Sequence, residues 1–230
     1  ILGHEWNEDL DNGFRPAGLI RMSSTTVNNV SYIQDYGSLY ASGTATHHLT
    51  LYRAPSGALV FSAGTVQWAW GLDSHHDTET GIPPERAMSS NTRVGEDLNG
   101  PVSAIQQATV NLFADMGVQP ATLEPGLVRA LASTDRSAPV SRLDQPMPRP
   151  AADGMLEISG TASDSGGVVA AVEVSIDGGA MWHPAEGTTA WRYRWKSSTG
   201  PATLSVLSRA ADDSANLEHP TKDHGSSQTP

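Results

Sequence analysis

Residues 159–195 have the sequence SGTASDSGGVVAAVEVSIDGGAMWHPAEGTTAWRYRW, and their pattern decides the fold of the C-terminal part. Val172, Val174 and Ile176 alternate with polar residues, which is the period of a half-buried strand. The run Asp177-Gly178-Gly179 supplies residues that tolerate the positive φ angles of a tight turn. Short strands separated by turns are typical of an all-β immunoglobulin-like sandwich, and we expect that fold here.

An aromatic stripe ends this stretch. Trp191, Tyr193 and Trp195 lie two residues apart, so they share one face of a strand, and two arginines between them occupy the other face. Such a stripe suits a carbohydrate platform, but an aromatic strand face is more often the core of a sandwich. We therefore interpret it as core.

The composition excludes several classes of function. The chain has 230 residues, with 25 acidic and 14 basic side chains and a formal net charge of −11. A negative surface repels nucleic acid and anionic membranes, so neither is expected as a partner. The chain has no cysteine, which excludes thiolate catalysis, cysteine–zinc sites and disulfides. No apolar run approaches the ~20 residues of a membrane span.

The expected organisation has four parts. Residues 133–150 contain four prolines, which remove backbone donors and favour an extended linker. The immunoglobulin-like sandwich follows over 151–218, and the polar residues 219–230 form a disordered tail. Residues 1–132 mix strand and helix signals and predict an α/β region. Because the sequence opens inside a strand-like run, with neither an initiator methionine nor a leader, we expect a piece of a longer polypeptide.

Two elements of residues 1–132 are clear from pattern. The runs 47–53 and 58–63 are rich in strand-forming residues and are joined by Pro55-Ser56-Gly57, which predicts a hairpin. Apolar residues recur at three- and four-residue spacing over 101–117, with a proline near the start and a glycine at the end, which predicts a helix. The polar loop 73–100 lies between them, and a loop of that length is usually functional.

Candidate binding residues border this loop. Trp68 and Trp70 lie two residues apart, so in an extended conformation both face one side and line a pocket for a sugar or amide plane. Core packing under the loop is the equal alternative. His75 begins the second of two histidine pairs. His47 and His48, in the first pair, point to opposite faces of a strand, so we assign no metal site.

One acidic run supplies the catalytic candidate. Residues 4–12 have the sequence HEWNEDLDN and follow a strand end, where α/β folds place functional groups. Glu5 lies beside Trp6, and an apolar neighbour raises the pKa of a carboxyl toward that of a general base. The alternative is a solvated or capping loop.

Three stretches carry a resemblance: LGHEWNEDLDNGFRPAGLIRMSSTTV (2–27), AGTVQWAWGLD (63–73) and PVSAIQQATVNLFADMGVQP (101–120). They resemble the C-terminal domain of the N,N-dimethylformamidase large-subunit family, which has a glutamine-amidotransferase-like α/β fold. Residues 159–195 are similar to bacterial immunoglobulin-like modules, including the dimerisation domain of sulfite oxidases. The resemblance implies a partial amidotransferase-like α/β domain followed by an all-β sandwich in an exported bacterial protein.

The resemblance also implies where chemistry would lie. The family hydrolyses small amides with an iron held by two tyrosines and a glutamate, and by position these ligands fall upstream of Ile1. No cofactor is therefore expected in this chain, and iron would belong to the parent protein. We expect a non-catalytic binding or structural unit, whose partners are upstream domains and carbohydrate or protein. The alternative is part of an amidohydrolase, with Glu5 near its site.

Overall fold

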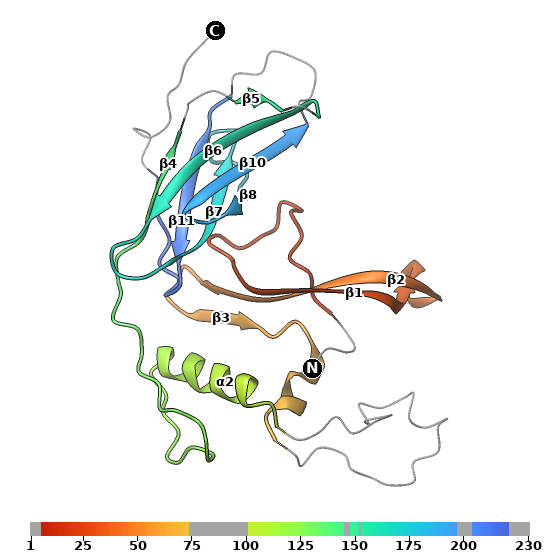
Figure 1. Cartoon of the computed structure of the whole chain (residues 1–230), viewed down its shortest axis with the longest axis vertical. Helices are drawn as coiled ribbons and strands as arrows, with labels where there is room; N and C mark the ends of the chain where they lie inside the picture. Colours follow the sequence, from red (N-terminus) through yellow and green to blue (C-terminus); the bar gives the residue numbers. More distant parts are fainter. Residues whose placement is uncertain (1–5, 74–100, 145–147, 152, 197–203, 221–230) are drawn as a thin grey trace. The chain divides into compact units, whose positions relative to one another are not determined.

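The computed structural model describes most of the chain and divides it into two compact units (Figure 1). Unit 1 holds residues 1–6 and 65–133, and unit 2 holds residues 7–64 and 134–230. The described residues are 6–73, 101–144, 148–151, 153–196 and 204–220. Glu5 and His75 lie outside them, as do most of the loop 73–100 and of the tail 219–230.

Unit 2 begins with a long antiparallel hairpin. Strands β1 (Ile20–Gln34) and β2 (Leu39–Arg53) pair from Ile20↔Leu51 to Gln34↔Leu39 and are joined by the 3-10 turn η1 (Asp35–Gly37). Strand β3 (Leu59–Ser62) pairs only with residues 50–53 of β2, which confirms the predicted hairpin. The register shifts between Asn28 and Val30, where Asn29 has a positive φ of 58°, as in a β-bulge. Strand β1 was missed because its polar sequence lacks apolar alternation.

The C-terminal part of unit 2 is built from two antiparallel sheets, which we call the two-sheet module. One has the order β4-β6-β10-β9, with β5 also paired to β6, and the other has the order β11-β7-β8. The strands are β4 (Val140–Leu143), β5 (Arg149–Pro150), β6 (Met155–Ser163), β7 (Val169–Ser175), β8 (His183–Pro184), β9 (Glu186–Gly187), β10 (Ala190–Lys196) and β11 (Leu207–Asp212).

Both sheets contribute to one apolar core, which contains Ile158, Val172, Val174 and Trp191. Tyr193 and Trp195 pack against that core and are half-buried. The aromatic stripe is therefore core, as predicted. The turn at Gly178 and Gly179 has φ angles of 76° and 98°, which confirms the expected turn.

The interval 133–150 differs from a simple linker. Its residues 140–143 form β4, which pairs with β6 from Val140↔Ser163 to Leu143↔Gly160. Pro139, at the start of this strand, is fully buried. The four prolines lie outside β4, so they remove no donor that β4 needs.

Unit 1 contains η2 (Val66–Gly71) and the helix α2 (Ser103–Asp115). The predicted helix is confirmed, and it buries Ile105, Val110 and Ala114. Gly71 lies so close to Ile105 that a Cβ there would overlap it. The described part of residues 1–132 thus holds antiparallel strands and one α-helix, and the expected α/β amidotransferase-like arrangement is not shown. None of the described helices is long and apolar enough to span a bilayer.

The hairpin sheet and the two-sheet module share a second small core. Ile20 at the start of β1 is buried with Ala211 and Ala215, and Leu59 and Leu217 pack around them. Gly18, which precedes β1, has a φ of 67° and lies against Leu217. Unit 2 is therefore one folded body formed from two separated stretches of sequence.

Candidate functional site

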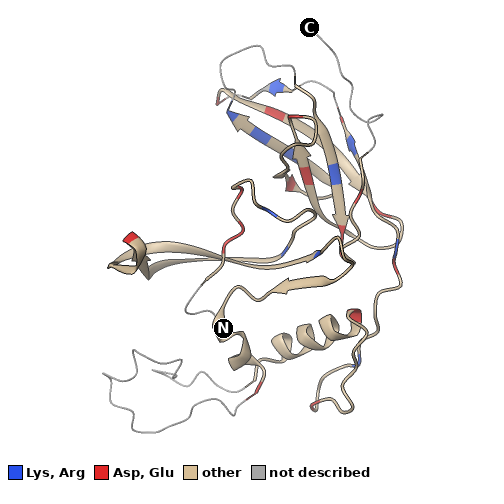
Figure 2. Ribbon diagram, turned by 180° about the vertical axis from the view of Figure 1, so that it is seen from behind, with Lys and Arg blue, Asp and Glu red and all other residues tan. Residues whose placement is uncertain are grey.

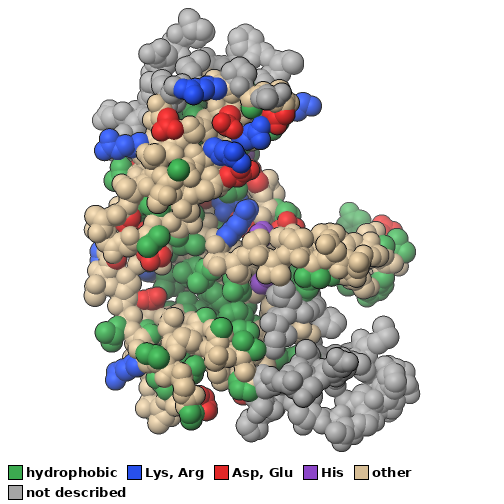
Figure 3. Space-filling model, viewed as in Figure 1, with side chains coloured by type: hydrophobic (Ala, Val, Ile, Leu, Met, Phe, Trp, Pro, Cys, Tyr) green, Lys and Arg blue, Asp and Glu red, His purple; other side chains and the backbone are tan. Residues whose placement is uncertain are grey.

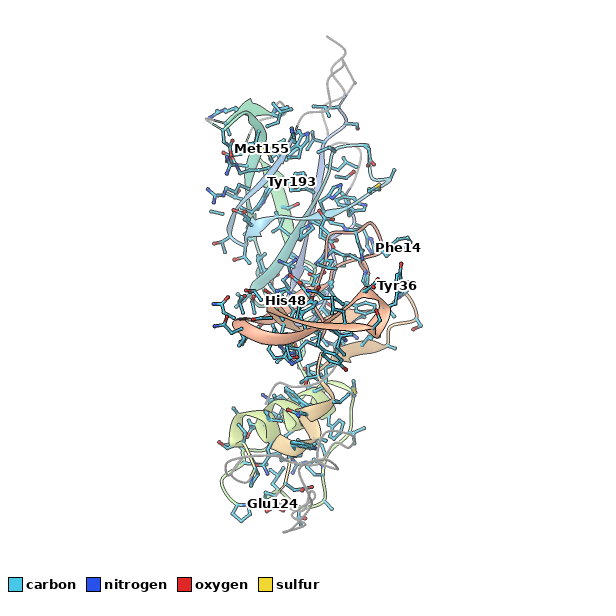
Figure 4. The ribbon with its side chains drawn as sticks, turned by 90° about the vertical axis from the view of Figure 1, so that its right-hand side faces the viewer. Phe14, Tyr36, His48, Glu124, Met155 and Tyr193 are labelled. Carbon is cyan, nitrogen blue, oxygen red and sulfur yellow. The ribbon has the colours of Figure 1, made fainter. Side chains whose placement is uncertain are left out.

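A hollow of about 350 Å³ lies in unit 2 between residues 7–19 and the strands β2 and β3. Its walls carry Asp9, Asn12, Arg15, His48 and Tyr52, together with the exposed ring of Phe14. Figure 4 shows His48 on the hairpin sheet. This concentration of ionisable and polar side chains makes the hollow the candidate functional site.

Asp9 is the most tightly held carboxylate of the site. It accepts two hydrogen bonds from Arg15, at 2.6 and 2.8 Å, and one from Arg21 at 2.6 Å. Its side chain is only 2% exposed. Burial alone would raise the pKa of Asp9, but the hydrogen bonds and charges of the two arginines outweigh burial and lower it. Asp9 is an anion committed to these arginines and is not available as a general base.

Glu173 on β7 extends the network into the two-sheet module. It accepts hydrogen bonds from Arg15 Nη1 at 2.9 Å, from the Gly18 amide at 3.1 Å, and from Arg209 at 2.7 Å. The Arg209 guanidinium also lies 4.0 Å from the ring centre of Trp182. Opposite charges alternate through the network, so each buried charge has a partner of the other sign. Figure 2 shows charged residues of both signs on the strands of this module.

His48 is fixed in one tautomer by its neighbours. The Asp9 amide donates to Nδ1 at 2.9 Å, so Nδ1 is the acceptor and the proton is on Nε2. That nitrogen lies 3.2 Å from Ser24 Oγ and must donate to it. Burial, with the charge of Arg21, lowers the pKa of His48. A neutral imidazole that donates to the serine cannot activate that hydroxyl as a nucleophile.

His47 faces the other side of β2, as predicted for adjacent strand residues. Its Nε2 lies 2.8 Å from the Ala63 carbonyl oxygen and donates to it. Both histidines are buried, with exposures of 3% and 6%. Gly64, next to Ala63, has a φ of 64°, and a Cβ there would lie 2.7 Å from the His48 carbonyl oxygen. The two imidazoles therefore contact different neighbours on opposite sides of β2.

A second polar contact joins the segment 7–19 to the two-sheet module. His183 Nδ1 lies 2.9 Å from an Asp11 carboxylate oxygen, and its ring stacks on Tyr193 with centroids 5.3 Å apart. Tyr193 stacks in turn on Trp195 at 5.5 Å. Burial, together with the charge of Asp11, raises the pKa of Tyr193 to about 12. This phenol therefore stays protonated at neutral pH.

Among the residues predicted from sequence, Trp68 and Trp70 are described. They lie on η2, and not in the extended conformation in which both rings would face one side. Residues two apart on a 3-10 helix point in different directions, and Trp70 is buried whereas Trp68 is half-buried. Core packing is the better interpretation of Trp70. Their role in binding substrate stays a prediction, as do the roles of Glu5 and His75.

Sequence reasoning missed Arg15, His48 and Glu173 as members of one network. A signal was present at Glu173, because a carboxylate in the apolar run VAAVEVS needs a buried partner. The partner itself lies 158 residues away, and no local pattern identifies it.

Three carboxylates of the two-sheet module also lie close together. One oxygen each of Asp135, Asp164 and Asp212 falls within 4.8 Å of the others. Burial raises the pKa of Asp212, hydrogen bonds from Asn216 and Ser214 oppose this shift, and the charge of Asp135 adds to it. Asp212 accepts from both residues in the turn that follows β11. This all-aspartate set does not match two tyrosines and a glutamate, so we assign no iron to it.

Comparison with known families gives two matches and no match to a curated protein. Residues 139–206 match the family model of the bacterial Ig domain, which covers most of the two-sheet module. Residues 1–80 match the model described as N,N-dimethylformamidase beta subunit-like, C-terminal. Both resemblances expected from sequence are confirmed, and the chain combines a region similar to this formamidase-like family with a bacterial Ig domain.

Proposed function

We propose that this chain is a non-catalytic binding and structural unit of an exported multidomain protein. The observation that carries the proposal is the ion-pair network of the candidate site. Asp9, Arg15 and Glu173 neutralise one another at side-chain exposures of 2–5%. His48 is neutral and bonded on both ring nitrogens. Among the described lining residues, Asp9, Arg15 and His48 are held by contacts that stabilise the fold, and Glu8 is an exposed carboxylate outside this network. The commitment of Asp9, Arg15 and His48 favours a binding role.

The ligand class that suits the hollow is a neutral carbohydrate. Asn12, Thr50 and Ser62 supply uncharged amide and hydroxyl groups on its wall. Phe14, with 88% of its surface exposed, and Tyr52 supply aromatic surface on which a sugar ring stacks. Hydroxyl-rich ligands are bound by this mixture of neutral hydrogen-bonding groups and aromatic faces.

Calorimetric titration of the chain with cellohexaose and chitohexaose tests this proposal. We expect binding of one of the two, lost in Phe14→Ser and retained in Leu131→Ser, which changes a similarly exposed side chain of unit 1. Binding that survives Phe14→Ser would place the ligand elsewhere. No heat with either sugar would contradict the carbohydrate assignment and leave protein domains as the partner.

Export is part of the proposal. A cysteine-free chain with a bacterial Ig domain is compatible with an extracytoplasmic setting. Fractionation of the native bacterium with an antibody against the chain should recover it from the periplasm or medium. Recovery from the cytoplasm would contradict the assignment.

A second candidate function is supported by the family match of residues 1–80. In this alternative the parent protein hydrolyses small amides, with Glu5 as a general base and Trp68, Trp70 and His75 near the substrate. Iron would supply Lewis-acid activation and would be held by parent-protein residues outside this chain. Glu5→Gln in the full-length protein should then abolish hydrolysis of N,N-dimethylformamide, whereas Glu8→Gln should not. Unchanged turnover in Glu5→Gln would exclude this role.

A further inference from the structure

The segment 7–19 contains an asparagine followed by a glycine, Asn12-Gly13, in an exposed turn. Gly13 has a φ of 81°. A second such pair, Asn99-Gly100, lies outside the described residues. Because glycine has no Cβ, the backbone nitrogen that follows Asn12 is less hindered than in any other Asn-Xaa pair. The side-chain carbonyl carbon of Asn12, Cγ, is therefore open to attack by that nitrogen.

The side chain of Asn12 is folded back along the backbone that follows it. Its Oδ1 accepts a hydrogen bond from the Phe14 amide at 3.0 Å, which makes an Asx turn. This turn directs Cγ toward the peptide bond between Asn12 and Gly13. When a nucleophile adds to Cγ, negative charge develops on Oδ1, and an N–H donor that already points at this oxygen stabilises the charge.

The backbone nitrogen of Gly13 is available for this reaction. Its N–H donates to no described residue, so removal of its proton by water or hydroxide breaks no described hydrogen bond. Apart from the chain neighbours of Gly13, a Cβ at this position would meet only Met181 Cε, at 3.7 Å. The turn therefore has room for a cyclic imide.

Ion pairs hold both ends of the turn. Arg15 donates to Asp9 across it at 2.6 and 2.8 Å, and Asp11 lies 2.9 Å from His183. Figure 3 shows acidic, basic and histidine side chains side by side just above the β1–β2 hairpin. Because these contacts keep the flanking residues in one arrangement, the reacting atoms of Asn12 and Gly13 stay close together.

We propose that Asn12-Gly13 is a site of spontaneous deamidation through a cyclic imide. The Gly13 nitrogen, after losing its proton to water or hydroxide, attacks Asn12 Cγ. A bond forms between this nitrogen and Cγ, the bond between Cγ and Nδ2 breaks, and the leaving group takes up a proton and departs as ammonia. Water then adds to either imide carbonyl and breaks its bond to the Gly13 nitrogen, which leaves aspartate or isoaspartate at position 12. The net exchange is ammonia for water, and nothing is oxidised or reduced.

Either product changes the hollow of the candidate site. The neutral amide of Asn12 is replaced by a carboxylate, on a wall that already carries Glu8 and Asp9. In isoaspartate the main chain also gains one methylene group between Asp9 and Arg15, so the turn between these paired residues becomes longer. The inference goes beyond the proposed function, because the reaction needs only water and no ligand of the hollow.

Incubation of the 230-residue chain at neutral pH, followed by peptide mapping with mass spectrometry, tests the proposal. Trypsin leaves Asn7 and Asn12 in one peptide, residues 1–21, since Arg15 precedes a proline. Fragment ions separate the two positions, and chromatography separates aspartate from isoaspartate. We expect Asn12 to lose its amide at least ~10-fold faster than Asn7, which is also exposed; this ratio corresponds to a barrier lower by ~1.4 kcal/mol.

Gly13→Ser keeps Asn12 but adds a side chain beside the attacking nitrogen, so it should slow deamidation of Asn12 at least ~10-fold. The control Gly57→Ser makes the same change at a glycine with a φ of 87° and should leave the rate at Asn12 unchanged. Circular dichroism of each variant confirms that it is folded.

Incubation in guanidinium chloride shows what the fold contributes. Asn12 should react at least as fast in the folded chain as in the unfolded chain, because the turn holds the reacting atoms together. The proposal is overturned by equal rates at Asn7 and Asn12, by an unchanged rate in folded Gly13→Ser, or by protection of Asn12 in the folded chain.

Discussion

Replacement of Glu173 by glutamine should destabilise unit 2 far more than its single lost charge suggests. Glu173 is 2% exposed and accepts from Arg15, Arg209 and the Gly18 amide. A glutamine has the same shape, but its amide nitrogen is a donor. The new N–H group would then point at N–H groups of Arg15, Arg209 or Gly18 that now donate to a carboxylate oxygen.

The size of the effect follows from the charges that remain. Arg15, with a side chain 5% exposed, keeps Asp9 as its partner, whereas among the described residues Arg209 keeps the Trp182 ring. Removal of one partner from a buried pair costs ~3–5 kcal/mol. Because Asp9 still neutralises Arg15, we expect about 3 kcal/mol, at the lower end of that range. With a urea m-value of ~2 kcal/mol/M, the midpoint should fall by about 1.5 M.

Urea unfolding followed by tryptophan fluorescence and by circular dichroism measures this change. Glu186→Gln is the matched control, since it makes the same substitution in a carboxylate paired with Arg192 at 2.8 Å, but at 68% exposure. Water screens this exposed pair, so its loss should hardly move the midpoint. A double-mutant cycle of Glu173→Gln with Arg15→Gln should then give a coupling energy above ~1 kcal/mol.

Equal midpoints for Glu173→Gln and Glu186→Gln would refute this reasoning. Such a result would mean that Arg15 and Arg209 reach water when Glu173 is neutral. The network would then be an exposed set of ion pairs and not the link between residues 7–19 and the two-sheet module.

Three further predictions concern single positions. His48 is held neutral in the fold while an unfolded histidine binds a proton near its ordinary pKa of 6.5, so unfolding free energy should fall as the pH drops below that value. His48→Asn should flatten this dependence in urea titrations at about pH 7.5 and about pH 5.5, and an unchanged slope would contradict it. Trp191→Ala should cost ~3–5 kcal/mol by thermal unfolding, because the ring is 3% exposed in the core; a loss below ~1 kcal/mol would contradict its core assignment. Gly64→Ala should cost more than ~1 kcal/mol in the same assay, because its Cβ strains a left-handed backbone and meets both His47 and His48; a neutral result would mean that the segment shifts freely.

The sequence was sufficient to predict those elements whose conformation depends on residues close to one another in the chain. The turn at Gly178 and Gly179 and the helix over 103–115 were predictable because a positive φ and a one-sided apolar period depend on near neighbours. The alternation around Val174 identified a buried strand for the same reason. The two family resemblances belong with these local signals, since each depends on a contiguous stretch.

The failures arise where the local apolar pattern does not specify the backbone conformation. Strand β1 is polar, and it forms because its partner β2 follows across a connection of four residues, 35–38. The extended conformation in which Trp68 and Trp70 would share one face does not form, because η2 follows its N-cap Thr65, whose side chain accepts a hydrogen bond from the Gln67 amide. Local sequence alone allowed either conformation.

By itself, the sequence determined the strand-and-turn character of residues 159–195, the helix, the absence of thiol chemistry and the negative charge, because each follows from composition or short-range spacing. Only the tertiary structure decided that residues 7–64 and 134–220 belong to one folded unit. Both a shared apolar core and buried ion pairs hold these two stretches together. Glu173 could enter the interior only where Arg15 and Arg209 neutralise it, and folding brings Arg15 there across 158 positions of sequence.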